Sequence, residues 1–273
     1  MLQIPAYPES LRTFSSEIGR NKALTQGPGG NTSWKTDEVL WVKASGTYLS
    51  SASDHEIFCP VMINNPDVSI YSNGLKPSIE VFLHAYIPEA FVVHVHSVAS
   101  IGLSVRKYVA ASTQDVLGSL GLSLLPYITP GEGLANAIVR ARKNCGAIKG
   151  FILQNHGLVL WGESIEEVYE DLLTIELMLS QDLSILPMVT PTNLELQQHL
   201  SNFKYLTPDH AVFDDLIEKT LLDNVDSWLK DLCWALWAST SSLKAEQCHL
   251  LSWEESTFLQ TWEKEKWRRN DHA

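Results

Sequence analysis

The stretch VVHVHSVAS, residues 92–100, places His94 and His96 two positions apart inside an apolar run. Alternate side chains of a β-strand point to the same face, so a strand here would hold the two imidazoles side by side. The flanking valines indicate that this strand is buried, and a buried imidazole is costly unless its nitrogens find partners. A shared metal ion would be such a partner, although a histidine pair at this spacing also arises by chance.

A second apolar run, GFILQNHGLVLWG at residues 150–162, predicts a hairpin of two strands around the tripeptide NHG. His156 in its turn would deliver a third imidazole to the pair. Three imidazoles leave a fourth position open, which is typical of catalytic rather than structural zinc. The alternative is that His156 is only a turn residue.

Strands and helices alternate outward from these two runs, which favours an α/β fold. The expectations rest on helical spacing of apolar residues, on β-branched runs and on turn residues. Helices are expected within residues 8–24, 77–87, 97–106, 113–121, 133–145 and 164–183. Strands are expected at the end of a Gly-rich turn at 25–35, at 39–46 and at 91–96, with short strands and loops at 49–74 and a strand or edge strand at 124–131.

The composition changes after residues 187–193, where the pattern becomes helical and rich in tryptophan. Six of the nine tryptophans lie in this part: Trp228, Trp234, Trp237, Trp253, Trp262 and Trp267. We therefore expect one domain at residues 1–190 and a helical extension at residues 191–273. Large aromatic side chains usually anchor cores and interfaces, so these tryptophans are expected to pack rather than to form a cofactor cage.

The 273-residue chain carries a formal net charge of −12. An acidic chain of this kind is a poor candidate for binding nucleic acid or an anionic membrane. It shows neither a secretion signal nor a run of about 18 apolar residues, so we expect a cytoplasmic protein without a transmembrane helix. The four cysteines lack CxxC spacing and are expected to be reduced thiols in that compartment.

Five motifs occur in a fixed order along the first two thirds of the chain: GGNTS (29–33), KASG (43–46), KPSIE (76–80), HVHS (94–97) and QNHGLVLWG (154–162). Together they resemble the class II, metal-dependent aldolase/adducin family over about residues 10–185. Their wording is similar to the aldolase part of bifunctional rhamnulose-phosphate aldolase/dehydrogenase chains, as is YLTPDH at 205–210. The resemblance implies a three-layer α/β/α fold around a central, mostly antiparallel sheet. It also implies a homo-oligomer, usually a tetramer, with active sites between subunits.

The resemblance also implies roles for individual residues. His94, His96 and His156 match the zinc ligands, and Glu80 matches the catalytic acid/base. A solvated glutamate near a helix N-terminus is the alternative for Glu80. The positions that match the phosphate-binding residues of the sugar-phosphate aldolases are Gly30, Asn31, Ser45, Gly46 and Ser78, where turns and a helix N-terminus would present N–H groups to an anion.

Lys43 could add a cation to that phosphate site, or it could only face solvent. Two positions depart from the fuculose-phosphate type. Ile79 stands where that type has a second serine, and the position of its proton-donating tyrosine falls on Asp115. Tyr108 and Tyr127 are nearby candidates, so no proton donor is assigned.

The implied function is a zinc-dependent aldolase that cleaves a ketose 1-phosphate to dihydroxyacetone phosphate and an aldehyde through an enediolate. Zinc stabilises such charge as a Lewis acid. Sugar-phosphate 4-epimerases, dehydratases and decarboxylases of the same family use the same chemistry and remain alternatives. A non-catalytic, adducin-like assembly module is an alternative of another class, although adducins lack the full histidine triad.

Overall fold

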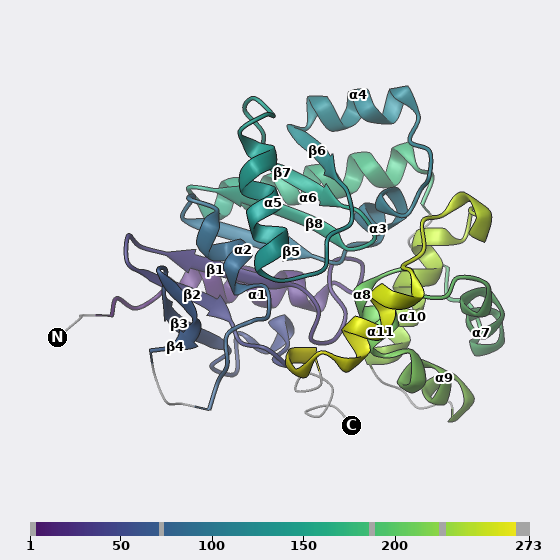
Figure 1. Cartoon of the computed structure of the whole chain (residues 1–273), viewed down its shortest axis with the longest axis horizontal. Helices are drawn as coiled ribbons and strands as arrows, with labels where there is room; N and C mark the ends of the chain where they lie inside the picture. The colour runs from purple at the N-terminus through teal and green to yellow at the C-terminus, as the bar shows by residue number, and fades with distance from the viewer. Residues whose placement is uncertain (1–3, 71–73, 186–188, 224–227, 266–273) are drawn as a thin grey trace.

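The computed structural model of the chain describes residues 4–70, 74–185, 189–223 and 228–265. Its centre is an eight-stranded sheet in the order β4-β3-β2-β1-β5-β8-β7-β6 (Figure 1). All neighbouring strands of this sheet are antiparallel except β6 and β7, which are parallel. The strands are β1 (Asn31–Lys35), β2 (Val39–Lys43), β3 (Phe58–Met62), β4 (Asn65–Ser69), β5 (Phe91–Val95), β6 (Leu122–Leu125), β7 (Gly150–Leu153) and β8 (Gly157–Gly162). The expected mostly antiparallel sheet is therefore confirmed.

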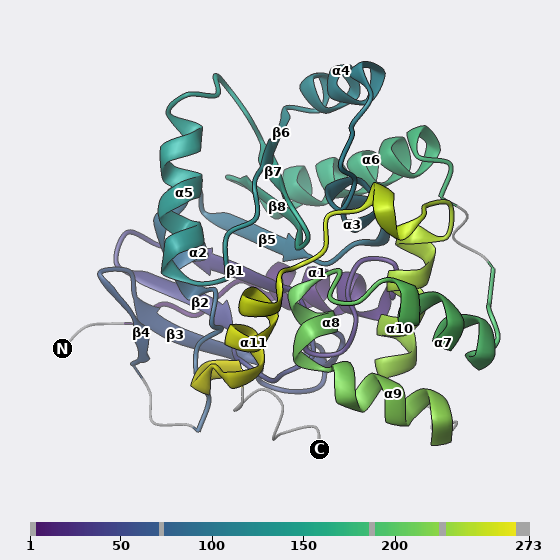
Figure 2. The same cartoon turned by 45° about the vertical axis from the view of Figure 1, so that its right-hand side comes forward.

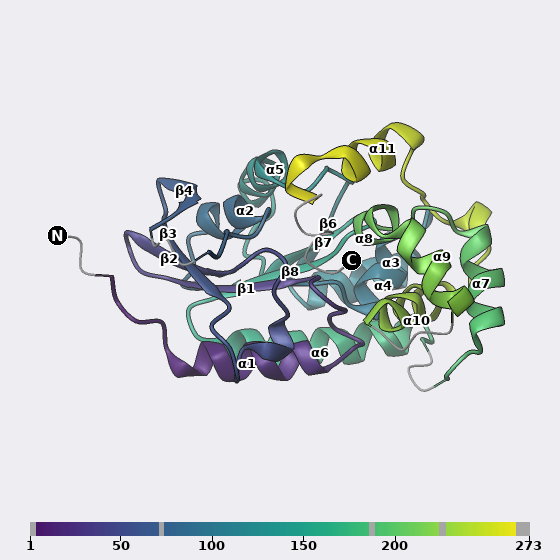
Figure 3. The same cartoon turned by 90° about the horizontal axis from the view of Figure 1, so that it is seen from below.

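Helices cover both faces of the sheet, as Figure 3 shows. On one face lie α1 (Glu9–Arg20) and α6 (Ile165–Asp182), and on the other α2 (Val81–Tyr86) and α5 (Glu132–Arg142). The face under α1 and α6 packs into one hydrophobic cluster and the face under α2 and α5 into two, which explains why the central strands are apolar on both sides. The three-layer α/β/α architecture expected from the motifs is confirmed.

The centre of the sheet is β5, which carries His94 and lies between β1 and β8. His94 is opposite Asn31 on one side and Val159 on the other. The predicted hairpin at 150–162 forms as β7 and β8. Helix α3 (Val98–Ser104) follows β5 at once and begins at Ser97, whose side chain accepts a hydrogen bond from the N–H of Ser100.

The strand expected at 124–131 is the edge strand β6, but it begins earlier, at Leu122, and ends at Leu125. Pro126 has no N–H to donate to a neighbouring strand, and this explains why the ladder stops there. The chain then continues as a loop to α5. Helix α4 (Ala111–Ser119) precedes β6 and occupies the segment where a short helix was expected.

The part of the chain after residue 190 is helical, as expected. Its helices gather at one end of the sheet, and α11 runs back toward it (Figure 2). They are α7 (Asn193–Asn202), α8 (Pro208–Val212), α9 (Asp214–Asp223), α10 (Trp228–Thr240) and α11 (Trp253–Thr261). A short 3-10 turn at Ala245–Gln247 lies between the last two helices, and another, at Leu49–Ser51, lies in the N-terminal half of the chain. The precise division of the chain at residues 190 and 191 stays a prediction.

Helix α10 joins this C-terminal part to the rest of the molecule. It packs against α3, and the hydroxyl of Ser239 donates a hydrogen bond to the carbonyl of Val98. Trp234 is buried in the main hydrophobic cluster, whereas Trp253 is 72% exposed. Trp267 lies outside the described residues.

All four cysteines are free thiols. Within the described ranges, no helix combines the length and the apolar character needed to cross a bilayer.

Candidate metal centre

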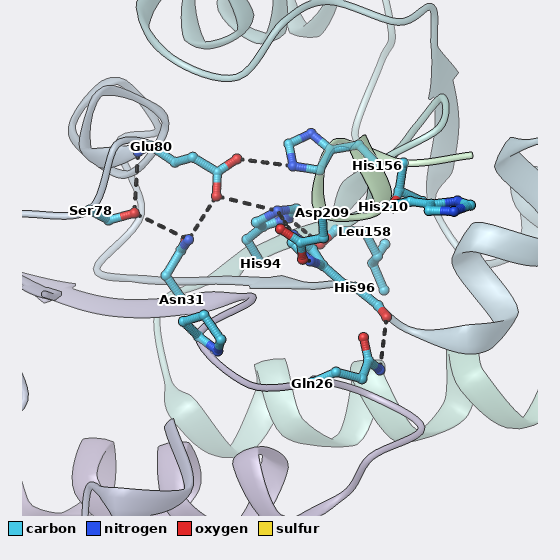
Figure 4. A network of polar contacts seen from close by, with 12 residues as sticks. Gln26, Asn31, Ser78, Glu80, His94, His96, His156, Leu158, Asp209 and His210 are labelled. Atoms are coloured by element: carbon cyan, nitrogen blue, oxygen red, sulfur yellow. Dashed lines mark hydrogen bonds and ion pairs between the residues drawn. The ribbon is translucent and has the colours of Figure 1, made fainter. Parts of the chain in front are cut away.

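Four buried side chains converge at the end of the central strands (Figure 4). His94 is the fourth residue of β5, His96 follows the strand, and His156 lies in the turn between β7 and β8. Because β8 pairs with β5, this turn is brought against the end of β5. Glu80 immediately precedes α2 and completes the group, whose ligand atoms all lie within 4.8 Å of one another.

The hydrogen bonds of the histidines fix which nitrogens face the centre. Nδ1 of His94 lies 3.0 Å from the carbonyl oxygen of Leu158, and Nδ1 of His96 lies 2.7 Å from Oδ2 of Asp209. Both Nδ1 atoms therefore face acceptors and carry protons, and in the neutral form of each ring the lone pair lies on Nε2. These Nε2 atoms are only 3.0 Å apart. Two Nε2 atoms at this distance need either a shared proton or a cation between them, and a divalent cation would bind both.

The positions of His156 and Glu80 also favour a bound cation. Nε2 of His156 lies 3.2 Å from Oε1 of Glu80, and Nε2 of His94 lies 3.5 Å from Oε2 of the same carboxylate. Nδ1 of His156 is buried and has no hydrogen-bond partner among the described residues. Three imidazoles and a carboxylate are ligands typical of zinc and related divalent ions.

The charge state of the group also suits a cation. Burial lowers the pKa of His94 and lowers that of His156 to about 3, so these imidazoles are neutral at neutral pH. Burial acts to raise the pKa of Glu80, but the three imidazoles and a hydrogen bond from Asn31 hold it below its usual range. An ionised carboxylate therefore lies among the imidazoles and away from water. A buried anion needs a counter-charge, which a divalent cation would supply.

A chain of hydrogen bonds orients the carboxylate of Glu80. Nδ2 of Asn31 donates to Oε2 of Glu80 at 2.8 Å, and the hydroxyl of Ser78 accepts from the backbone N–H of Glu80 at 3.2 Å. Asn31 is held in turn by Nε2 of His84, whose Nδ1 accepts from the hydroxyl of Ser33 at 2.7 Å. The structure thus assigns Asn31 and Ser78, expected at the phosphate, to the surroundings of Glu80 as well.

His84 is a member of this network that the motifs do not include. Its position four residues after Glu80, at the start of a helix, is the one signal in the sequence that the two side chains share a face.

The predicted phosphate-binding residues are near one another but do not all line one cavity. Ser45 and Ser78 line a cavity of about 650 Å³, together with Ile79 and with Glu263 and Lys264 from the C-terminal part. Glu80 and the three histidines are not among its lining residues. Ser78 connects the cavity with the metal centre, because its hydroxyl accepts a hydrogen bond from the N–H of Glu80.

Four of the predicted phosphate-site residues, Gly30, Asn31, Lys43 and Gly46, lie outside that lining. Gly30 and Gly46 have φ angles of 70° and 79° and lie in the two turns expected there. Lys43 is only 2% exposed and donates from Nζ to the carbonyl of Pro28 at 2.9 Å, so it does not face solvent.

The tyrosine candidates lie in different surroundings. Tyr108 is 79% exposed, whereas Tyr127 packs against the second hydrophobic cluster of the C-terminal part. Asp115 is exposed. The proton donor stays unassigned.

The family described as "Class II Aldolase and Adducin N-terminal domain" matches residues 12–183. The chain belongs to this family. The matched range contains the four converging side chains, and the helices from α7 onward lie beyond it.

Relatives of this class II aldolase family member align with about three fifths of the chain. The "Uncharacterized oxidoreductase YuxG" of Bacillus subtilis is 30% identical over 201 residues, which are 63% of this chain and 29% of that protein. The chain therefore spans less than a third of that relative. A methylthioribulose-1-phosphate dehydratase of Klebsiella pneumoniae is 27% identical over 181 residues, or 59% of this chain and 88% of the relative.

A solved structure shows the same fold. The N-terminal class II aldolase domain of a conserved protein from Thermoplasma acidophilum superimposes with a TM-score of 0.56 at 26% identity, covering 66% of this chain and 95% of that domain.

The geometry predicts that His94→Ala, His96→Ala and His156→Ala each lose bound metal while the fold survives, because each variant removes one converging Nε2 atom. Metal content by atomic emission after purification, with circular dichroism for the fold, checks this. His55→Ala, at an exposed histidine, is the matched control and should keep the metal. A variant that retains stoichiometric metal would remove its residue from the ligand set.

Proposed function

We propose that this chain is a divalent-metal-dependent lyase that cleaves a ketose 1-phosphate of the rhamnulose or fuculose type to dihydroxyacetone phosphate and an aldehyde. The observation that carries the proposal is the convergence of Glu80 with three imidazole nitrogens in a buried group. Zinc is the proposed metal because imidazole and carboxylate ligands suit it. When bound, the ion supplies Lewis-acid stabilisation of charge on the substrate oxygens.

Glu80 is proposed to move the proton in this reaction. In a retro-aldol cleavage, a base removes the proton of the hydroxyl at C4, the C3–C4 bond breaks, and an enediolate forms across C2 and C3. The enediolate is then protonated to give dihydroxyacetone phosphate. Asn31 donates a hydrogen bond to the carboxylate of Glu80, and Ser78 accepts one from its backbone N–H, so a positioned carboxylate is available to accept the proton.

The phosphate is proposed to bind near the two turns and the start of α2, at Gly30, Asn31, Ser45, Gly46 and Ser78. Ser45 and Ser78 line a cavity beside the metal centre, which supports a substrate that reaches from the cavity to the metal. Nζ of Lys43 donates a hydrogen bond to the carbonyl of Pro28 in the Gly-rich turn. Its ammonium group would bring positive charge to the phosphate site of this otherwise acidic chain.

Dehydration is the second candidate reaction. Methylthioribulose-1-phosphate dehydratases align with this chain over most of their own length, 88% for the Klebsiella pneumoniae protein. Elimination would remove a proton from C3 and hydroxide from C4, so it needs the same carboxylate and the same enediolate. The two reactions differ in the proton that the base removes, from the C4 hydroxyl or from C3, and in the bond that breaks, C3–C4 or C4–O.

The cellular compartment and the oligomeric state are part of the proposal. Four free thiols suit a reducing, cytoplasmic compartment. A homotetramer is proposed because the family resemblance implies one.

A panel of ketose 1-phosphates with product identification tests the function. Rhamnulose, fuculose and methylthioribulose 1-phosphates separate an aldehyde product from loss of water. The proposal expects dihydroxyacetone phosphate from a deoxyketose phosphate. A metal-loaded protein that turned over none of them would contradict it and favour the adducin-like alternative.

We expect Glu80→Gln to keep its metal and to lower turnover by about 10²–10⁴-fold, the usual effect of losing a positioned acid/base group. The amide has the same size but cannot exchange the proton. Steady-state kinetics together with metal content measure this, and Glu38→Gln, at an exposed glutamate, should leave both unchanged. Near-normal turnover of Glu80→Gln would assign the proton transfer to another group.

Lys43→Met should weaken use of a phosphorylated ketose much more than that of its dephosphorylated analogue, because charge-assisted hydrogen bonds contribute about twice as much as neutral ones. The measurement is kcat/KM for the matched pair in wild type, Lys43→Met and Lys149→Met. Lys149 is a surface residue paired with Asp171 and serves as the control. If the wild type shows no preference for the phosphorylated compound, the sugar-phosphate proposal fails.

A further inference from the structure

The C-terminal part of the chain reaches the metal centre through Asp209. This residue lies in the first turn of α8, beyond the range matched by the family. Its Oδ2 atom lies 2.7 Å from Nδ1 of His96, and both residues are almost completely buried, with 4% and 5% exposed. The contact joins positions 113 residues apart in the sequence.

We propose that Asp209 is a positioning residue of the metal centre, which fixes the tautomer and the orientation of His96. The helical C-terminal part thereby completes the metal centre, whose ligands all lie in residues 12–183, the range matched by the family. This inference rests on the proposed function as a metal-dependent enzyme and adds to it a residue from outside the family domain.

The physical basis is the second nitrogen of a metal-binding imidazole. A carboxylate that accepts from Nδ1–H leaves the lone pair on Nε2 and makes the ring a better ligand. A charged acceptor also forms a shorter and stronger hydrogen bond than a neutral carbonyl does. His94 has the neutral kind of partner, the Leu158 carbonyl, so His96 alone of these two rings is held by a charge.

The surroundings of Asp209 leave it little freedom. Thr207 caps α8 by accepting a hydrogen bond from the N–H of His210 at 3.2 Å, and Pro208 begins the helix. Gly29 packs against the carboxylate of Asp209 and the ring of His96. A Cβ atom at Gly29 would lie 2.9 Å from Nδ1 of His96 and 3.0 Å from Oδ2 of Asp209. The glycine-rich turn therefore packs directly on this hydrogen bond, and a side chain there would push the pair apart.

A second contact ties the C-terminal part to another ligand. Nδ2 of Asn155 donates to the carbonyl of Leu206 at 2.7 Å and to that of His249 at 2.9 Å. Asn155 has a φ of 57°, a conformation that asparagine tolerates better than most residues, and it directly precedes His156. Leu206, Asp209 and His249 of the C-terminal part thus contact His96 or the residue that precedes His156.

The test is the zinc affinity of Asp209→Asn and Asp209→Ala in the full chain. Each protein is stripped of metal and titrated with zinc in competition with a chromophoric chelator, and thermal unfolding is followed with and without zinc. Asp231→Asn is the matched control, since Asp231 also links the C-terminal part to the main domain, through an exposed ion pair with Lys22 at 3.6 Å.

We expect the zinc Kd to rise about 10–100-fold in the Asp209 variants, the usual effect of removing the partner of a metal-binding histidine. Asn retains an acceptor oxygen without the charge, so it should fall between the wild type and Ala. The increase in Tm on adding zinc should shrink in the same order. Asp231→Asn should bind zinc like the wild type.

The outcomes separate this role from the proposed function. If both Asp209 variants bound zinc with the same Kd as the wild type, Asp209 would only stabilise the fold, and the inference would be overturned. This holds even if the Tm of the metal-free variants were lower. A wild-type protein that bound no zinc would overturn the proposed function, and this role with it.

Discussion

The constraint on which the site depends is the meeting of imidazole lone pairs around a buried carboxylate. Nε2 of His94 and Nε2 of His96 are 3.0 Å apart, with both Nδ1 protons already donated elsewhere, and Glu80 adds a negative charge. Without a cation or a shared proton between the two Nε2 atoms, this arrangement combines repulsion with the cost of a buried anion. With one, the same features become a preformed set of ligands, and the surrounding elements serve to hold it.

The sheet brings these groups together because the strands that carry them are neighbours. β5 pairs with β8, so the turn with His156 meets the residues just after His94. The approach is close: a Cβ atom at Gly157, where φ is 152°, would lie 2.2 Å from the carbonyl oxygen of Val95. Only glycine allows the two segments to come so near. On the other side β1 places Asn31 opposite His94 and beside Glu80.

Features of the fold and of the site that depend on a local sequence pattern could be predicted from the sequence. Two histidines two apart in an apolar run and a hairpin around NHG indicated three converging imidazoles, and alternating helices and strands indicated an α/β fold. The mostly antiparallel sheet and the role of Glu80 were implied by the family resemblance. Contacts between distant segments left no such pattern. Asp209 reaches His96 across 113 residues, and Lys264 reaches the cavity beside Ser78 from near the end of the described chain. Lys43 shows the same limit, because its sequence position could not tell solvent from the buried contact with Pro28 that the fold gives it.

X-ray absorption at the metal edge of the zinc-loaded protein tests the central claim most directly. The account predicts one zinc per chain with three imidazole nitrogens at about 2.0–2.1 Å and oxygen at about 2.0–2.2 Å. Multiple scattering from the imidazole rings would identify the nitrogens as histidine. A spectrum with sulfur at about 2.3 Å, which would point to the cysteines, or with fewer than three imidazoles, would contradict the proposed centre.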